Sequence, residues 1–181
     1  MNIGGLTLGK NPVIKSVQYG YINVTTLTNT ATITAVDTNN AYVVHMGDNM
    51  GNTTSNYPAD NSFYLELTNA TTVTATRAGQ SYARVTYFMV IEYYPGIIKS
   101  IQNTSASNDN TSVTINAVNT NKTILINRGA LRAVTSTDGF FRSRYNLYLA
   151  NSTTVSSATY TIVGDAESGT STLYFTVVEF Y

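Results

Sequence analysis

The sequence predicts an all-β protein made of two tandem β-sandwich-like units, Ig-like or jelly-roll-like, which follow an extended N-terminal arm. Three observations predict this fold class: a composition typical of strands, an alternation of apolar and hydroxyl residues, and an internal repeat of the whole pattern. We expect the arm at residues 1–12, the first unit at residues 13–95 and the second unit at residues 96–181.

The composition favours strands over helices. Hydrophobic residues make up 43% of the chain, but charged residues only 11%, against roughly 25% in typical soluble domains. Thr, Asn and Ser supply the polarity, and Val, Ile, Thr and Tyr are residues that fit a pleated, half-buried surface. Glu, Lys and Gln, which favour helices, are scarce.

The internal repeat consists of four segments that return in the same order. Residues 13–18 match 97–102, residues 32–39 match 114–121, residues 65–73 match 147–155, and residues 87–94 match 174–181. The offsets stay between 82 and 87 residues, and their small drift indicates loops of different length. The pattern therefore predicts a duplicated unit.

Each unit reads as a series of short strands. Residues 31–36 alternate with a period of two, which predicts one core face and one wet face. Residues 85–94 are apolar on both faces, as expected of a central strand that is covered on both sides. Clusters of Asn, Asp, Gly and Ser separate six or seven such strands per unit. Tyr-Tyr-Pro-Gly at residues 93–96 leaves almost no linker, so we expect the units to be packed or rigidly joined.

Charge and cysteine content exclude several functions. The formal net charge is zero and no basic stripe exists, so a nucleic-acid partner is not expected. The chain has no cysteine, hence no disulfide framework and no thiolate metal site. It shows neither a secretion signal nor an apolar run of roughly 20 residues. We therefore expect synthesis in a cytoplasm and no membrane partner.

Candidate catalytic residues are few. His45 is the single histidine, and it aligns with Asn127 of the repeat, so a structural role is expected. Glu92 and Glu179 occupy equivalent positions, and the duplication explains their recurrence without catalysis. We expect each carboxylate to bond to backbone or to a lysine, such as Lys15 or Lys99.

The segment that begins at Asp48 resembles a calcium loop but lacks its alternating acidic pattern, so a polar turn is expected. Weak calcium binding by Asp48 and Asp60 stays open as an alternative. No constellation supports an enzyme, a metal site or a cofactor, and we predict none.

Two equivalent loops differ in charge. Residues 47–62 carry Asp48 and Asp60 and no basic residue. The equivalent loop combines arginines with aromatic residues, namely Arg128, Arg132, Phe140, Phe141, Arg142 and Arg144. Arginine beside exposed aromatics is typical of protein interfaces. One interpretation is that this loop docks on an acidic partner such as a neighbouring subunit, and the other is that both are solvated, divergent loops.

Four segments carry a resemblance to a known class of protein. Residues 14–18, 35–38, 67–77 and 90–94, with weaker copies in the second unit, resemble small duplicated β-rich structural proteins of tailed bacteriophages. These include head decoration or cement proteins and tail-associated virion proteins. The second unit departs from the pattern because it lacks a counterpart of Arg77.

The resemblance implies a virion protein at the capsid surface, made in the host bacterial cytoplasm, that binds the major capsid protein and stabilises the head shell. The alternative is a tail, fibre or adhesin module that binds host-surface carbohydrate. We expect a homo-oligomer, specifically a trimer, because proteins of both kinds favour threefold positions. The resemblance brings no catalytic residue.

Overall fold

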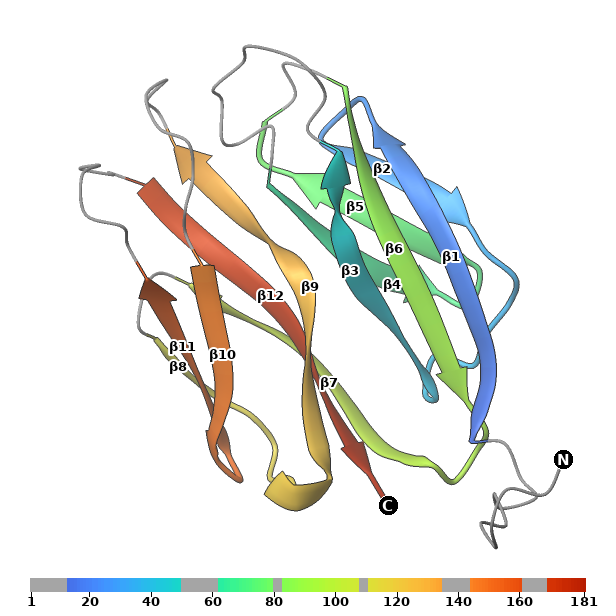
Figure 1. Cartoon of the computed structure of the whole chain (residues 1–181), viewed down its shortest axis with the longest axis vertical. Coiled ribbons are helices and arrows are strands. Elements are labelled where there is room, and N and C mark those ends of the chain that lie inside the picture. The colour runs from blue at the N-terminus through green and yellow to red at the C-terminus, as the bar shows by residue number, and fades with distance from the viewer. Residues whose placement is uncertain (1–12, 50–61, 80–82, 108–110, 135–143, 161–168) are drawn as a thin grey trace, which may run out of the picture.

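A computed structural model describes residues 13–49, 62–79, 83–107, 111–134, 144–160 and 169–181 (Figure 1). These residues form twelve strands, no α-helix and one short 3-10 helix, η2 (Thr120–Lys122). The prediction of an all-β, sandwich-like protein is confirmed. The predicted arm at residues 1–12 lies outside the described residues.

The strands fall into two halves of six. The N-terminal half contains β1 (Ile14–Val24), β2 (Thr28–Thr32), β3 (Ala41–Asn49), β4 (Phe63–Asn69), β5 (Thr72–Arg77) and β6 (Arg84–Tyr93). The C-terminal half contains β7 (Ile98–Ser107), β8 (Ser112–Thr114), β9 (Thr123–Val134), β10 (Arg144–Asn151), β11 (Thr154–Tyr160) and β12 (Gly169–Phe180). They build three sheets, in the orders β1-β6-β3, β10-β11-β8 and β2-β5-β4-β9-β12-β7.

The two halves share one strand order. In the N-terminal half β6 lies between β1 and β3, and in the C-terminal half β12 lies between β7 and β9. Likewise β5 lies between β2 and β4, and β11 between β8 and β10. Adding six to each strand number therefore converts one order into the other. The expectation that residues 85–94 form a central strand is confirmed, since β6 pairs with neighbours on both sides. The expectation that both faces of this strand are covered is wrong, because its outer face is open at Tyr87, which is 42% exposed.

Each half encloses its own apolar core, because a strand with period two sends every second side chain inward. In β5, for example, Val73 and Ala75 are fully buried while the residues between them are only partly covered. The buried core of the N-terminal half consists of Ile22, Val24, Val36, Ala41, Val43, Phe63, Leu65, Val73, Ala75, Phe88 and Val90. That of the C-terminal half consists of Ala106, Ile115, Val118, Val155, Phe175 and Val177.

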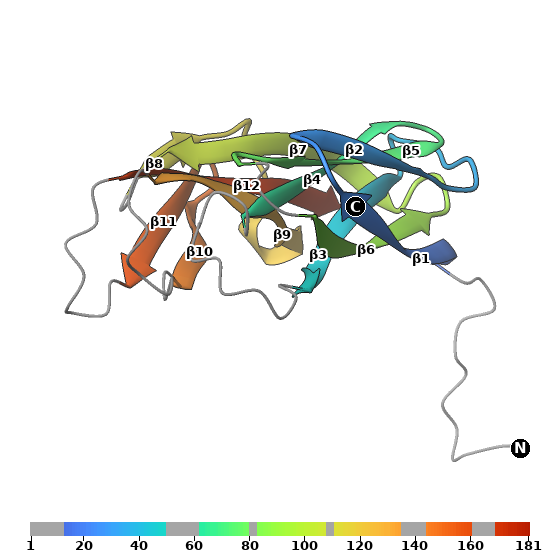
Figure 2. The same cartoon turned by 90° about the horizontal axis from the view of Figure 1, so that it is seen from above.

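One sheet runs through both halves. Tyr64 of β4 pairs with Gly129 of β9, and this contact joins three strands of each half into the six-stranded sheet. Figure 2 shows β3 and β6 under one part of that sheet and β10 and β11 under the other. The short turn before β7 keeps the halves together, with Gly96 at a φ of 85° that favours glycine.

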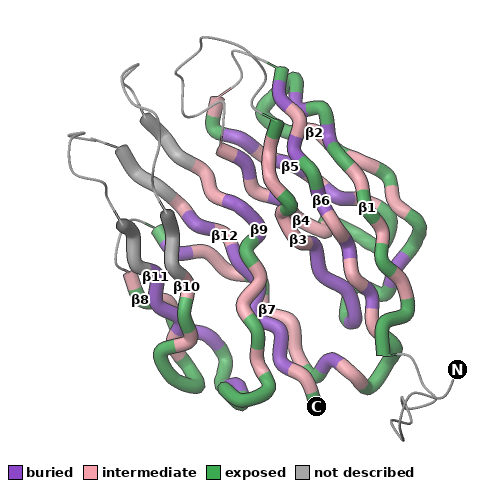
Figure 3. The backbone as a smooth tube through the Cα atoms, in the orientation of Figure 1, coloured by how far each residue is buried: buried purple, intermediate pink, exposed green. Residues whose placement is uncertain are grey.

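Coverage differs between the two central strands. From Leu173 to Phe180, β12 has only buried or intermediate residues, because its outer face packs on the N-terminal half. Its counterpart β6 alternates between buried residues and residues that are intermediate or exposed. The sheet around β6 is open on its outer side: in Figure 3, exposed positions recur along β1, the neighbour of β6.

Candidate interaction surfaces

The junction between the halves centres on Gly129. Its φ is 109°, and a Cβ at this position would lie 2.0 Å from the carbonyl oxygen of Phe63. Tyr64 and Tyr174 are the cross-strand neighbours of Gly129 on β4 and β12. Their rings stack with centroids 3.8 Å apart and planes 8° apart. The absence of a side chain at Gly129 thus lets two backbones and two rings meet.

Arg128 anchors the same junction. Its guanidinium donates hydrogen bonds of 3.4 Å to three backbone carbonyls, those of Leu65, Thr104 and Phe175. Burial lowers the pKa of this guanidinium, while the Glu66 carboxylate, 3.9 Å from Nη1, acts in the opposite direction. The placement of Arg128 in an exposed docking loop is therefore wrong. This residue lies in β9 and is 4% exposed, so it binds the chain's own strands.

An apolar cluster extends the junction. The N-terminal half contributes Tyr42, Val44, Ile91 and Tyr93, and the C-terminal half contributes Ile98, Ile101, Ile126, Val178 and Phe180. The hydroxyls of Tyr42 and Tyr93 lie 3.2 Å apart, and the ring of Tyr93 meets that of Phe180 edge-on at 5.6 Å. Burial raises the pKa of Tyr42, and its hydrogen bond to Tyr93 adds to this rise. A cavity of about 80 Å³ next to this cluster is lined in part by Leu67, Asn103 and Arg128.

The other members of the predicted charged loops are spread over strands or lie outside the described residues. Asp48 belongs to β3 rather than to a loop, and its carboxylate lies 2.9 Å from His45 Nε2. Arg132 and Arg144 belong to β9 and β10, whose side chains are not described at these positions. Asp60, Phe140, Phe141 and Arg142 lie outside the described residues. The docking interpretation of the Arg/Phe loop therefore stays a prediction.

The two recurring glutamates are structural clamps. Glu92 Oε1 accepts hydrogen bonds from Lys15 Nζ at 2.7 Å and from the backbone N–H of Asp37 at 2.9 Å, and Ser16 Oγ donates to Oε2. Burial opposes ionisation of Glu92, but these donors outweigh it and hold the pKa of Glu92 below its ordinary value. The expectation of a lysine partner and a backbone partner is confirmed.

Glu179 repeats the arrangement. Lys99 donates to it at 2.9 Å, the backbone N–H of Asn119 at 2.8 Å and Ser100 Oγ at 3.4 Å. The hydrogen bond from Lys99 holds the pKa of Glu179 below its ordinary value. Each carboxylate is nearly inaccessible and satisfied by local donors, which is a geometry of structural support rather than of proton transfer to a substrate.

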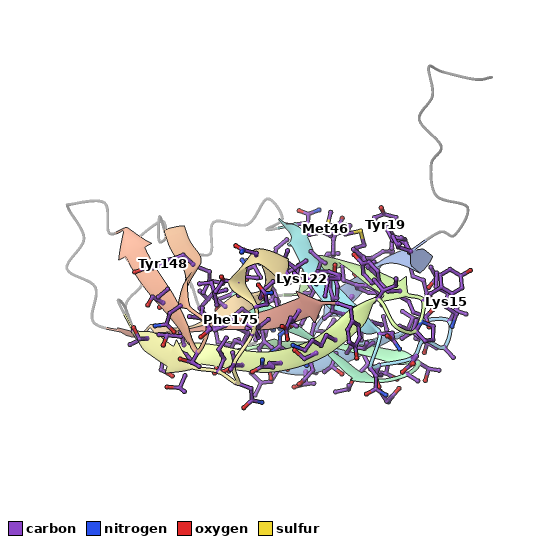
Figure 4. The ribbon with its side chains drawn as sticks, turned by 90° about the horizontal axis from the view of Figure 1, so that it is seen from below. Lys15, Tyr19, Met46, Lys122, Tyr148 and Phe175 are labelled. Carbon is purple, nitrogen blue, oxygen red and sulfur yellow. The ribbon has the colours of Figure 1, made fainter. Side chains whose placement is uncertain are left out.

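An exposed aromatic surface lies on the outer side of the β1-β6-β3 sheet. We call Val17, Tyr19, Tyr21 and Tyr87 the tyrosine face. Tyr19 is 74% exposed and Tyr21 59% exposed, and the rings of Tyr21 and Tyr87 lie 6.3 Å apart on paired strands. Figure 4 shows Tyr19 on the outer side of the molecule. No charged residue interrupts these positions, and aromatic residues in such a setting are typical of binding surfaces.

Sequence reasoning missed this surface, although the signal was present. Val17, Tyr19 and Tyr21 follow each other at a spacing of two, so a strand must place all three on one side. The alternation alone did not say which side, because large apolar residues normally indicate the core. Ile22 and Val24 fill the core from the opposite side of β1.

Neither a cluster of metal-ligating side chains nor a membrane-spanning helix occurs in the part of the chain that the structure describes. No group of three or more His, Asp or Glu side chains converges there as a metal site would require. Within the same residues, no helix has the length and apolarity needed to cross a bilayer. Comparison with known proteins finds no matching family model, no matching curated protein and no matching solved structure.

Proposed function

We propose that this chain is a non-enzymatic structural protein of a bacteriophage particle, and that it decorates the head shell by binding the major capsid protein. The tyrosine face is the observation that carries the proposal. It offers four large apolar or aromatic side chains on a sheet whose backbone is fixed by pairing on both sides of β6. Tyrosine supplies much contact area at little conformational cost, which suits a surface that docks on another protein.

The proposal includes an origin by duplication of one sandwich unit. The repeated clamps support it, since Lys15, Ser16 and Glu92 recur as Lys99, Ser100 and Glu179 with the same bonds. A second repeated contact supports it as well. Gln18 exchanges two hydrogen bonds with the backbone of Thr34, and Gln102 does the same with Asn116. In this proposal the first copy keeps its outer face free for the capsid.

A second candidate is a tail, fibre or adhesin module that binds host-surface carbohydrate. The same rings favour it, because Tyr19 and Tyr21 present an apolar body together with a polar hydroxyl to the solvent. The two candidates differ in the binding partner and not in the surface, so one set of variants tests both.

The test is binding of purified protein to phage heads that lack it, followed by imaging. We expect saturable decoration at regular shell positions and greater resistance of the heads to heat and osmotic shock. The variant Tyr19→Ser with Tyr21→Ser should fold normally, because both side chains are exposed, yet lose binding. The matched control is Leu27→Ser, a substitution of an exposed apolar residue outside the tyrosine face. Binding to tails or host cells instead of heads would replace the decoration role with the second candidate.

A further inference from the structure

The junction between the halves uses one edge from each half, and among the described residues no strand pairs with the counterpart edges. Tyr42 and Val44 at the start of β3 pack against the C-terminal half, so the unpaired part of that edge is the stretch around Gly47. β4 pairs with β9, and the counterparts of these two strands are β10 and β3. Among the described residues β3 pairs only with β6, and β10 pairs only with β11. An unpaired edge presents backbone donors and acceptors that a further strand can use.

Gly47 gives the edge of β3 the same backbone conformation that Gly129 gives β9 at the junction. It is the counterpart of Gly129, with a φ of 112° against 109°. Both follow a register shift at the same point, since Gly47 pairs with Tyr87 and Gly129 with Tyr174. At Gly129 the backbone of β4 fills the space where a Cβ would be, but at Gly47 no described residue apart from its two chain neighbours lies within 4 Å of that position. The junction geometry is therefore present in β3 without a strand against it.

The side chains around the two glycines differ as a pair. At the closed junction Arg128 faces Glu66, with 3.9 Å between charged atoms. The counterparts of these residues are Met46 on β3 and Tyr148 on β10, which are 52% and 53% exposed. Thus a charged pair inside the chain corresponds to two exposed apolar side chains. Methionine and an aromatic ring are a favourable contact, with sulfur about 5 Å from the ring.

We propose that β10 of a second copy pairs with β3 at Gly47, as β4 pairs with β9 at Gly129, and places its Tyr148 against Met46. The contact would repeat the β4–β9 junction between two molecules. In this contact the unpaired edge of β3 in one copy pairs with the unpaired edge of β10 in the other. The contact also removes Met46, Tyr148 and part of Tyr87 from water.

A second copy fits better than the same chain. Within one molecule β10 lies beyond β9 from β3, as Figures 1 and 2 both show, and Met46 and Tyr148 are separated in Figure 4. The internal contact joins β4 to β9 without joining β3 to β10, so it does not close on itself as a twofold contact would. Repetition of such a contact continues from copy to copy and yields a ring or an open chain. This inference goes beyond the proposed function and does not rest on it.

Disulfide crosslinking tests the contact directly, because the chain has no cysteine of its own. Met46→Cys protein and Tyr148→Cys protein are mixed and mildly oxidised, and we expect a disulfide-linked dimer that neither variant forms alone. The matched control mixes Tyr19→Cys with Tyr148→Cys, which should give no disulfide-linked dimer because Tyr19, although more exposed, lies on β1 and outside the proposed contact. Crosslinking of the control to the same extent would overturn the proposal.

The double variant Met46→Cys with Tyr148→Cys separates the two possible partners. Crosslinked oligomers are expected, whereas a purely intramolecular disulfide would show that β10 closes on its own chain and would overturn the proposal. Sedimentation of the wild-type protein adds a measurement without cysteines. We expect association that Met46→Glu weakens by about tenfold or more, and a wild-type monomer at every concentration would equally refute the contact. If the protein fails to bind phage heads but the Met46→Cys and Tyr148→Cys variants still crosslink, the result would count against the proposed function and leave this contact intact.

Discussion

Tyr64 and Tyr174 stack face to face across the strand that separates them, with Gly129 between them in register. The pair joins β4 of one half to β12 of the other, so its contribution to stability measures the junction between the halves rather than either core. Burial raises the pKa of Tyr174, which agrees with a ring that is withdrawn from water, and the neighbouring Tyr64 adds to the effect.

A double-mutant cycle on these rings measures the junction. We expect Tyr64→Ala and Tyr174→Ala each to lower the free energy of unfolding, with a coupling energy of about 0.5–1.5 kcal/mol between them. Urea denaturation of the two single variants and the double variant gives this coupling. The pair Tyr21 and Tyr87, 6.3 Å apart and exposed, is the comparison and should couple more weakly. Additive effects at Tyr64 and Tyr174 would contradict the stacked arrangement.

Alanine substitutions of the two counterpart glycines, Gly47 and Gly129, distinguish the cost of backbone strain from the cost of steric contact. Gly47→Ala places a side chain at a φ that L-residues rarely adopt, which costs about 1–3 kcal/mol. Gly129→Ala meets the same strain and must also displace the Phe63 carbonyl, which adds about 1–3 kcal/mol. We therefore expect Gly129→Ala to be clearly the less stable variant in urea denaturation. The comparison belongs at low protein concentration, where self-association is absent, and equal losses would show that β4 does not press on Gly129.

Removal of the Arg128 guanidinium should loosen three strands at once. Arg128→Met deletes its hydrogen bonds to carbonyls of β4, β7 and β12 and should lower the free energy of unfolding by about 1–3 kcal/mol. Arg128→Lys should recover little, because an ammonium group lacks the planar fork that reaches several acceptors. Lys122→Met, at an exposed position, is the control and should have almost no effect. Full stability of the lysine variant in thermal denaturation would argue that charge alone matters.

The glutamate clamps predict the acid limit of stability. The folded pKa values of Glu92 and Glu179 lie below the ordinary value of 4.5, so the unfolded chain binds protons more readily in acid. The stabilisation is fully present above pH 4.5 and is lost as the pH falls through the folded pKa values.

Substitution of both clamps with glutamine should lower stability at pH 7 by about 1 kcal/mol per site, a modest figure because both lysines are half-exposed. It should also flatten the dependence of unfolding free energy on pH below 4.5. Denaturant titrations between about pH 3 and about pH 7 give both quantities. An unchanged acid slope in the double variant would assign acid unfolding to other carboxylates.

Local chemistry determined most of the strands. The strand at residues 85–94 is readable because side chains in a strand alternate between faces. The alternation at residues 31–36 misplaced a strand, since β2 ends at Thr32 and residues 33–36 form none. The partners of Glu92 were also accessible, since the repeat placed Lys15 and Lys99 in equivalent positions. Arg128 was misplaced because its charge suggested solvent, and only its contacts with distant carbonyls reveal burial.

The sequence by itself thus determined an all-β chain, the repeated order of its segments and the central place of β6. Only the tertiary structure decided how the halves meet: that β4 joins β9, that a Cβ at Gly129 would meet β4 while one at Gly47 would contact no other described strand, and that Tyr19 and Tyr21 stay outside. The physical reason is that periodicity fixes which residues share a face of a strand. It does not fix what covers that face or which edge is paired, because these depend on strands distant in sequence.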